Sequence, residues 1–170
     1  MKKNFAILCL FALINGYAQN LPAVLGGVLE VDGTGIARIT PFAGLWINGL
    51  GFARIGVNTG SHKEIDSKEG DLKEEKRLDV SAQIGFSPTG PEHPYIAASY
   101  VRNKAYSSDG DVAWNEWGLG FGHRFSLSPY AAIVIEAEHR WIAEHYNQLQ
   151  EREISGRKLQ MNFGLVVYPY

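Results

Sequence analysis

Large apolar residues that alternate with small or polar ones at a period of two constrain the fold of this chain more than any other feature. From Trp117 to Trp141 the chain alternates Gly with Trp, Leu and Phe, turns at Ser126–Pro129, and then alternates Ile with Glu. Successive side chains of a strand point to opposite faces, so this period places the large apolar residues on one face. Leu78–Phe86 and Leu159–Val167 show the same pattern. The alternation predicts a β-sheet with one apolar face and one polar face.

Turn residues divide the chain into eight expected strands. We expect these strands at 22–31, 36–48, 51–63, 74–87, 93–106, 112–127, 130–146 and 153–169. Pro41 would interrupt the second strand unless it lies at a bulge or a strand end. Short turns and longer charged loops follow one another in alternation, which is typical of outer-membrane barrels. The sequence therefore predicts an all-β fold, an eight-stranded antiparallel up-and-down transmembrane β-barrel.

The first residues have the pattern of a secretory signal peptide. Lys2 and Lys3 precede an apolar run from Phe5 to Ile14, and small residues follow up to Ala18. This order of a basic start, an apolar centre and a small-residue end is typical of a cleaved export signal. We expect residues 1–18 to be a signal peptide cleaved after Ala18, and residues 19–170 to be the barrel domain.

Cysteine content and charge exclude several classes of function. The one cysteine, Cys9, lies inside the expected signal peptide, so a mature chain would have neither disulfides nor thiol chemistry. The chain has 16 Lys and Arg against 18 Asp and Glu. A balance of this kind gives no reason to expect a nucleic-acid partner.

Two arguments predict which face of the barrel lies inside. An eight-stranded barrel has room inside only for packed side chains or one small ligand, and the polar face is the one rich in glycine, including Gly118, Gly120 and Gly122. An arginine or lysine at the lipid midplane would cost about 2–4 kcal/mol, whereas opposite charges packed inside can pair. We therefore predict that the apolar face contacts lipid and that the polar face encloses an ion-paired lumen without an open pore.

This orientation assigns a role to particular residues. The lumen is predicted to hold an ion network made of Glu30, Arg54, Arg77, Asp79, Arg102, Glu116, Arg124, Glu136, Glu138 and Arg140. The residues predicted to face lipid are Leu78, Val80, Ile84, Phe86, Trp117, Leu119, Phe121, Phe125, Ile133, Ile135, Trp141, Met161, Phe163 and Leu165. Lys104 is expected on the lumen side beside Arg102, and Tyr95 is expected on the outer face in an aromatic belt at the short-turn end.

The stretch GLGFGHRFSLSPYAAIVIEAEHRW, residues 118–141, resembles the penultimate hairpin of the OmpA/OmpX-like family of small outer-membrane barrels. The positions that match or lie near the family pattern are Gly118, Gly120, Phe121, Arg124, Glu138 and Arg140. The resemblance implies a cell outer-membrane location in a Gram-negative envelope, with membrane lipid as a partner. It also implies assembly by the barrel-insertion machinery, which in this family reads an outward-facing C-terminal aromatic. Tyr170 is an aromatic in that place, but the parity of Leu159–Val167 points it inward unless Pro169 resets the register. It implies a structural or surface-interaction role, and names neither a surface partner nor a cofactor.

Two other functions fit some of these features. Lipid A deacylases are barrels of similar size that use a His and a Ser two residues apart, but none of the five histidines here is followed two residues later by Ser. His145 comes nearest, with Asn147 in the place of the nucleophile. A soluble lipocalin-like lipid carrier would fit Gly44–Trp46, but the chain offers no segment for the C-terminal helix of that family. We expect no catalytic, metal-binding or cofactor-binding residues.

Overall fold

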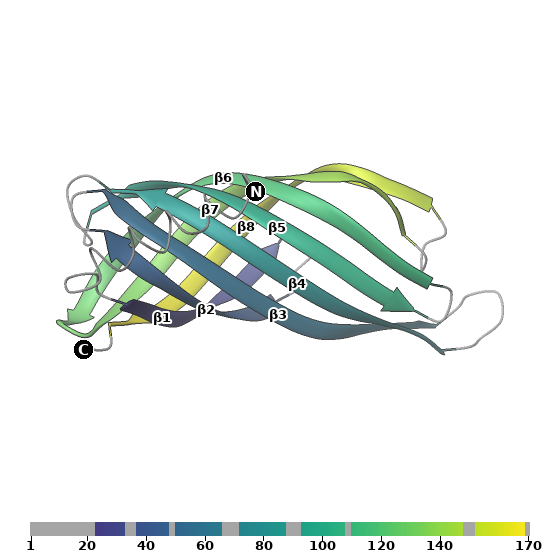
Figure 1. Cartoon of the computed structure of the whole chain (residues 1–170), viewed down its shortest axis with the longest axis horizontal. Coiled ribbons are helices and arrows are strands. Elements are labelled where there is room, and N and C mark those ends of the chain that lie inside the picture. The colour runs from purple at the N-terminus through teal and green to yellow at the C-terminus, as the bar shows by residue number, and fades with distance from the viewer. Residues whose placement is uncertain are drawn as a thin grey trace, which may run out of the picture.

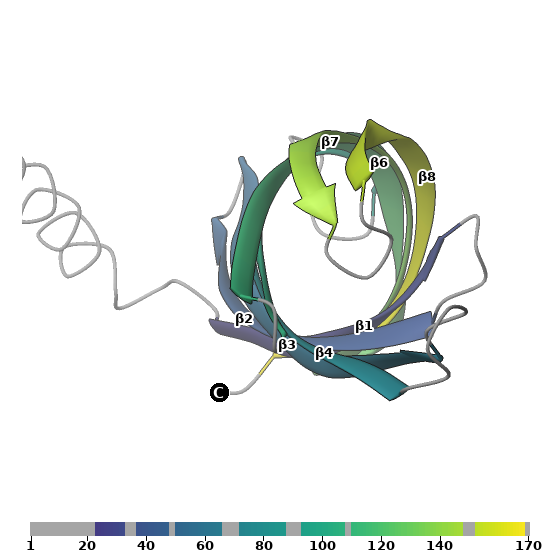
Figure 2. The same cartoon turned by 90° about the vertical axis from the view of Figure 1, so that its right-hand side faces the viewer.

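The chain folds into a closed antiparallel barrel. The computed structural model describes residues 23–32, 37–47, 50–65, 72–87, 93–107, 110–147 and 152–168. Its strands are β1 (Ala23–Asp32), β2 (Ala37–Ile47), β3 (Gly51–Ile65), β4 (Leu72–Phe86), β5 (Tyr95–Ser107), β6 (Gly110–Ser128), β7 (Ala131–Asn147) and β8 (Arg152–Val167). Each strand pairs with the next, and β8 returns to pair with β1, which closes the ring seen in Figure 2.

The eight expected strands are confirmed, with ends that shift by one or two residues. Figure 1 shows these strands running obliquely to the long axis, as closure of a barrel requires. The expected signal peptide lies outside the described residues. Within the described part of the chain there is no helix long and apolar enough to cross a membrane.

Side chains alternate between the inside and the outside along the strands. On β7, Val134, Glu136 and Glu138 are buried, whereas Ile133 and Ile135 are exposed. The same alternation on β6 leaves Trp117, Leu119 and Phe121 outside. The barrel therefore turns its aliphatic rows outward, in the orientation that the sequence pattern predicts.

The faces of β5 differ from the prediction. Tyr95 points inward and is buried, whereas Arg102 is exposed and shares the outer face with Ile96. Lys104 lies on this outer face too, so the predicted lumen positions of Arg102 and Lys104 and the predicted outer position of Tyr95 are wrong. The reason is that β5 carries apolar residues on both faces, and its outer face changes from apolar to basic toward Ser107. Period-two alternation alone cannot show which face of such a strand lies inside the barrel.

Pro41 lies in the middle of β2, where the pairing of β2 with β3 stops. The register between these strands runs from Ile47–Gly51 to Phe42–Gly56 and ends there. Proline has no N–H to donate, so the ladder cannot continue through it. Beyond this point the Asn58 side chain bridges the two strands by donating from Nδ2 to the Ile39 carbonyl oxygen at 2.9 Å. Pro41 thus marks the end of a ladder within a continuous strand.

Glycine permits close packing inside the barrel. A Cβ atom added at Gly122 would lie 2.5 Å from Cζ of Tyr95 and 2.8 Å from Cγ of Glu136, whereas one added at Gly60 would meet nothing within 4 Å. Gly122→Ala is therefore expected to destabilise the folded barrel by about 1–3 kcal/mol through overpacking. Unfolding in urea after refolding into detergent measures this, with Gly60→Ala as the matched control. Equal midpoints for the two variants would contradict the packing described here.

Candidate functional site

The upper half of the lumen, on the side of the longer loops, holds a network of ion pairs. We call Arg140 with Glu138, Glu116, Glu30 and Lys158 the Arg140 cluster. Arg140 donates from Nε and Nη2 to Oε2 of Glu138, each at 2.8 Å, and its Nη1 lies 3.7 Å from Oε2 of Glu116 and 3.9 Å from Oε2 of Glu30. Lys158 Nζ lies 2.9 Å from the same Glu116 oxygen. One guanidinium therefore joins carboxylates from three strands, and the ammonium adds a fourth strand.

A second ion pair lies beside the Arg140 cluster. Arg38 Nη1 on β2 donates to Oδ2 of Asp79 on β4 at 3.1 Å. Arg77, also on β4, lies with its Cζ 5.4 Å from the centre of the Trp114 ring, which stacks on His145 at 4.2 Å. Lys158 was not predicted as a member of the network, although its even position on β8 shares a face with buried Gln160 and Asn162 and could have indicated it.

The lower half of the lumen is different, because aromatic side chains fill it. We call Phe42, Trp46, Phe52 and Tyr95 the aromatic plug. Trp46 stacks on Phe52 with ring centres 6.0 Å apart, and Tyr95 meets Phe52 edge-on at 5.0 Å. The plug belongs to a buried cluster whose other members are Val24, Val28, Ala97, Val134 and Val166, with Tyr168 packed against it. The prediction of a polar lumen thus holds for the upper half, and an apolar core closes the lower half.

Glu136 lies at the edge of the aromatic plug and accepts three hydrogen bonds. Arg54 donates from Nη2 to its Oε2 at 2.6 Å, Asn162 donates to the same oxygen at 3.1 Å, and the Tyr95 hydroxyl donates to Oε1. Arg54 also lies with its Cζ 4.7 Å from the Phe42 ring centre. This carboxylate is buried, and its partners come from three other strands.

Arg124 points inward as predicted, but it joins no ion network. Its Cζ lies 4.4 Å from the ring centres of both Trp46 and Phe52 and 5.6 Å from that of Tyr95. Within the described part of the chain no carboxylate comes within ion-pair distance of it, and its Nε and Nη1 have no hydrogen-bond acceptor. The prediction that Arg124 pairs with a carboxylate is therefore wrong, because the aromatic plug surrounds this level of the barrel.

All other residues predicted for the lumen network point inward, and Arg102 is the exception. Arg102 Nη1 and the Tyr100 hydroxyl both donate to Oδ1 of Asn115 on the outer face, at 2.7 Å and 2.9 Å. Further along β5, Lys104 Nζ lies 3.0 Å from Oδ2 of Asp111, and this hydrogen bond raises the pKa of Lys104. The residues predicted to face lipid all lie on the outer face, where Leu78 and Met161 are half-buried and the others are exposed.

A small cavity lies in the upper lumen. The cavity between Glu30, Arg38, Asn58, Asp79 and Lys158 has a volume of about 10 Å³. A cavity of this size holds about one water molecule.

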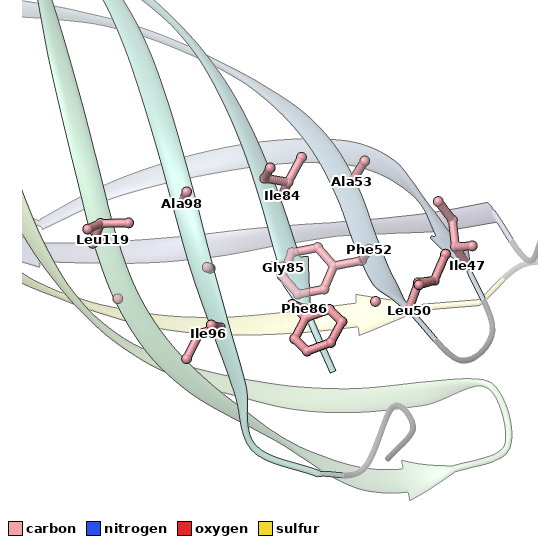
Figure 3. A pocket seen from close by; sticks show the side chains of 13 residues that line it. Ile47, Leu50, Phe52, Ala53, Ile84, Gly85, Phe86, Ile96, Ala98 and Leu119 are labelled. Carbon is pink, nitrogen blue, oxygen red and sulfur yellow. The ribbon is translucent and has the colours of Figure 1, made fainter. Parts of the chain in front are cut away.

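A hollow also lies on the outside of the barrel. It is a groove of about 580 Å³ across β3, β4, β5 and β6, near the short turns. Figure 3 shows its lining, where small residues such as Ala53 and Ala98 lie between large ones such as Ile84, Ile96 and Leu119. The lining is apolar, and its exposed side chains, among them those of Ile84, Ile96 and Leu119, belong to the outward face, so the groove opens on the exposed apolar surface.

The histidines make no catalytic arrangement in the part that the structure describes. The His123 ring stacks on Phe125, His139 meets Trp141 edge-on, and His145 stacks on Trp114. None of these contacts joins a histidine to a serine or a carboxylate. The described residues also contain no group of three or more His, Cys, Asp or Glu placed to hold a metal ion.

Comparison with known proteins adds evidence on the fold. No family model matches the chain, and no curated protein matches it. Among solved structures, it is similar to Neisserial surface protein A, with 18% identity and a TM-score of 0.50 over 88% of this chain and 96% of that one. It is also similar to a major outer membrane protein from Thermus thermophilus, with 12% identity and a TM-score of 0.54 over 87% and 98%. The chain therefore has the fold of a small eight-stranded outer-membrane β-barrel.

Proposed function

We propose that this chain is an integral outer-membrane protein whose barrel has a structural or surface-interaction role. The observation that carries this proposal is the exposed apolar surface around the barrel. Phe121 is 68% exposed, and Ile84 and Ile96 are each 65% exposed. A soluble monomer rarely exposes a continuous apolar area of this kind, whereas a lipid-facing surface requires one.

Aromatic residues support the membrane placement because they gather at both ends of this apolar surface. Phe86 and Phe125 lie outward near the short turns. At the other end the register aligns Tyr100 with Trp117 and Trp117 with Trp141. Aromatic side chains prefer the interface between hydrocarbon and headgroups, so two such rows fit the two surfaces of a bilayer.

The closed lumen argues against transport as the role of the barrel. The Arg140 cluster lies across the upper half, and the aromatic plug lies across the lower half. A lipid-carrier function would need an apolar cavity inside, and the internal space described here is small and polar. What remains for function is the stable barrel itself and the upper ends of its strands. We propose no enzymatic step and no cofactor.

The proposed location implies two partners for this chain. Membrane lipid would contact the outward rows, and the barrel-insertion machinery would assemble the chain after export directed by residues 1–18. The resemblance to the OmpA/OmpX-like family supports both proposals.

Cell fractionation tests the location. We expect the protein in the outer-membrane fraction, in a form that runs faster on a gel when it is not boiled, because a folded barrel resists dodecyl sulfate. Boiling should shift it to the mobility of an unfolded chain. Recovery in the soluble periplasmic fraction, with the same mobility before and after boiling, would contradict the proposal.

A further inference from the structure

We propose that the lower lumen is a binding site for one small monovalent anion, held by the Arg124 guanidinium inside the aromatic plug. The site does not depend on the proposed membrane role, because it rests on contacts inside the barrel. Its ligand class is halide, with chloride as the ion available to an exported protein.

The first argument is the burial of a charge without a counter-charge. Arg124 is 2% exposed, and rings of the plug cover it on several sides. Aromatic faces attract a cation, but they give no acceptor to N–H groups that lie in the guanidinium plane. A side-chain hydrogen bond with Tyr168 gives Arg124 a neutral partner, and Nε and Nη1 are buried without an acceptor among the described residues. A buried charge of this kind requires a partner of opposite charge.

The second argument is that the carboxylate at the edge of the plug is already engaged. Glu136 accepts from Arg54, Asn162 and Tyr95, which occupy both of its oxygens. The lower lumen as described thus contains two guanidinium groups, those of Arg54 and Arg124, and one carboxylate. The excess of one positive charge favours an anion over a water molecule, because water would accept hydrogen bonds without supplying negative charge.

The third argument is the presence of further unused donors around the same ring. Trp46 Nε1 and Arg54 Nη1 are also buried without an acceptor in the described part of the chain. Both side chains neighbour Phe52, since Trp46 stacks on it and the Arg54 Cζ lies 5.6 Å from its ring centre. Arg124 contacts the same ring. Buried donors in proteins are nearly always satisfied, and a single spherical anion can accept from several that surround it.

Bromide is a suitable probe because it resembles chloride and scatters anomalously. The purified full chain is refolded into detergent, and its unfolding midpoint in urea is measured while bromide replaces gluconate at constant sodium concentration. We expect the midpoint to rise with bromide and to saturate, as linkage to one site requires. Arg124→Gln should lower the apparent bromide affinity at least tenfold.

Arg140→Gln is the matched control, because Arg140 is also a buried arginine but has its own carboxylates. This variant should unfold at lower urea but keep the saturating bromide response. If Arg124→Gln does not refold, crystals of the unchanged protein grown in bromide give a second measurement, an anomalous peak beside the Arg124 guanidinium. A midpoint that does not respond to bromide, an equal response in wild type and Arg124→Gln, or density at Arg124 that belongs to water or to a carboxylate of the chain would overturn the proposal.

Discussion

Replacement of Arg140 by Met is expected to destabilise the folded barrel by about 3–5 kcal/mol, because it leaves buried carboxylates without their cation. Glu138 would lose both of its bonds to Arg140, and Glu116 and Glu30 would lose their shared guanidinium. Methionine has a similar length and fills much of the same space. The loss of stability therefore measures the removal of the charge and not the creation of a cavity. The free energy of unfolding in urea, measured after refolding into detergent or vesicles, gives the value.

Arg102→Met is the control for this experiment. Arg102 lies on the exposed outer face, where its polar contact is with Asn115, and surface changes of this kind usually alter stability by no more than about 0.5 kcal/mol. A double variant, Arg140→Met with Glu138→Gln, should recover part of the loss because it removes one stranded charge. If Arg140→Met and Arg102→Met were equally stable, the Arg140 cluster would not be an ion network.

Phe121→Arg is expected to cost about 2–4 kcal/mol in a bilayer, the usual penalty for a cation near the midplane of the lipid-facing surface. Phe121 lies in the middle of the outward row between Trp117 and Phe125, and its neighbours across the strands are Ile96 and Ala137. Refolding into phospholipid vesicles should therefore yield less heat-resistant, fast-migrating barrel than the unchanged chain does. The unfolding midpoint of the barrel that does form should also fall.

Two variants separate charge in lipid from other effects. Phe121→Leu keeps the position apolar and should stay close to wild type. Ser61→Arg places the same charge on the outer face of β3, beyond the end of the ladder with β2 and opposite Lys76, where the strand is exposed and polar. It should refold normally. A Phe121→Arg protein that inserts as well as Ser61→Arg would show that this surface does not contact hydrocarbon.

The strands and most of their faces could be predicted from sequence because each depends on a local pattern. On β4, β6, β7 and β8 most large apolar residues share one parity, and the structure places these outside, whereas Trp114, Val134 and Val166 have the other parity and are buried. The prediction failed on β5, where Tyr95 and Val101 are buried on one face while Ile96 and Ala98 occupy the other. A strand that has apolar residues on both faces shows no alternation of apolar and polar residues, so its inner face cannot be identified from the sequence.

The partners inside the lumen could not be predicted, because they depend on register between strands far apart in sequence. Arg54 and Glu136 are 82 residues apart and meet across the barrel, and Arg140 reaches Glu30 only because β8 pairs with β1. Arg124 shares the same parity and charge as Arg140, yet it lies among rings. The sequence pattern does not distinguish these two arginines. They differ in their level along the barrel axis, which places Arg140 among carboxylates and Arg124 among aromatic rings.

Because the β2–β3 ladder ends early, backbone hydrogen bonding is weaker between these two strands than between β3 and β4. β3 is hydrogen-bonded to β4 along its whole length, up to Ile65 and Leu72, but to β2 only as far as Phe42 and Gly56. Above that point the Asn58 side chain, which donates to Ile39 and Thr40, takes the place of backbone hydrogen bonds between β2 and β3. Local thermal opening of the barrel is therefore expected to begin between the upper parts of β2 and β3. Such an opening would admit water to the Arg38 side of the interior while the other strand pairs stay hydrogen-bonded.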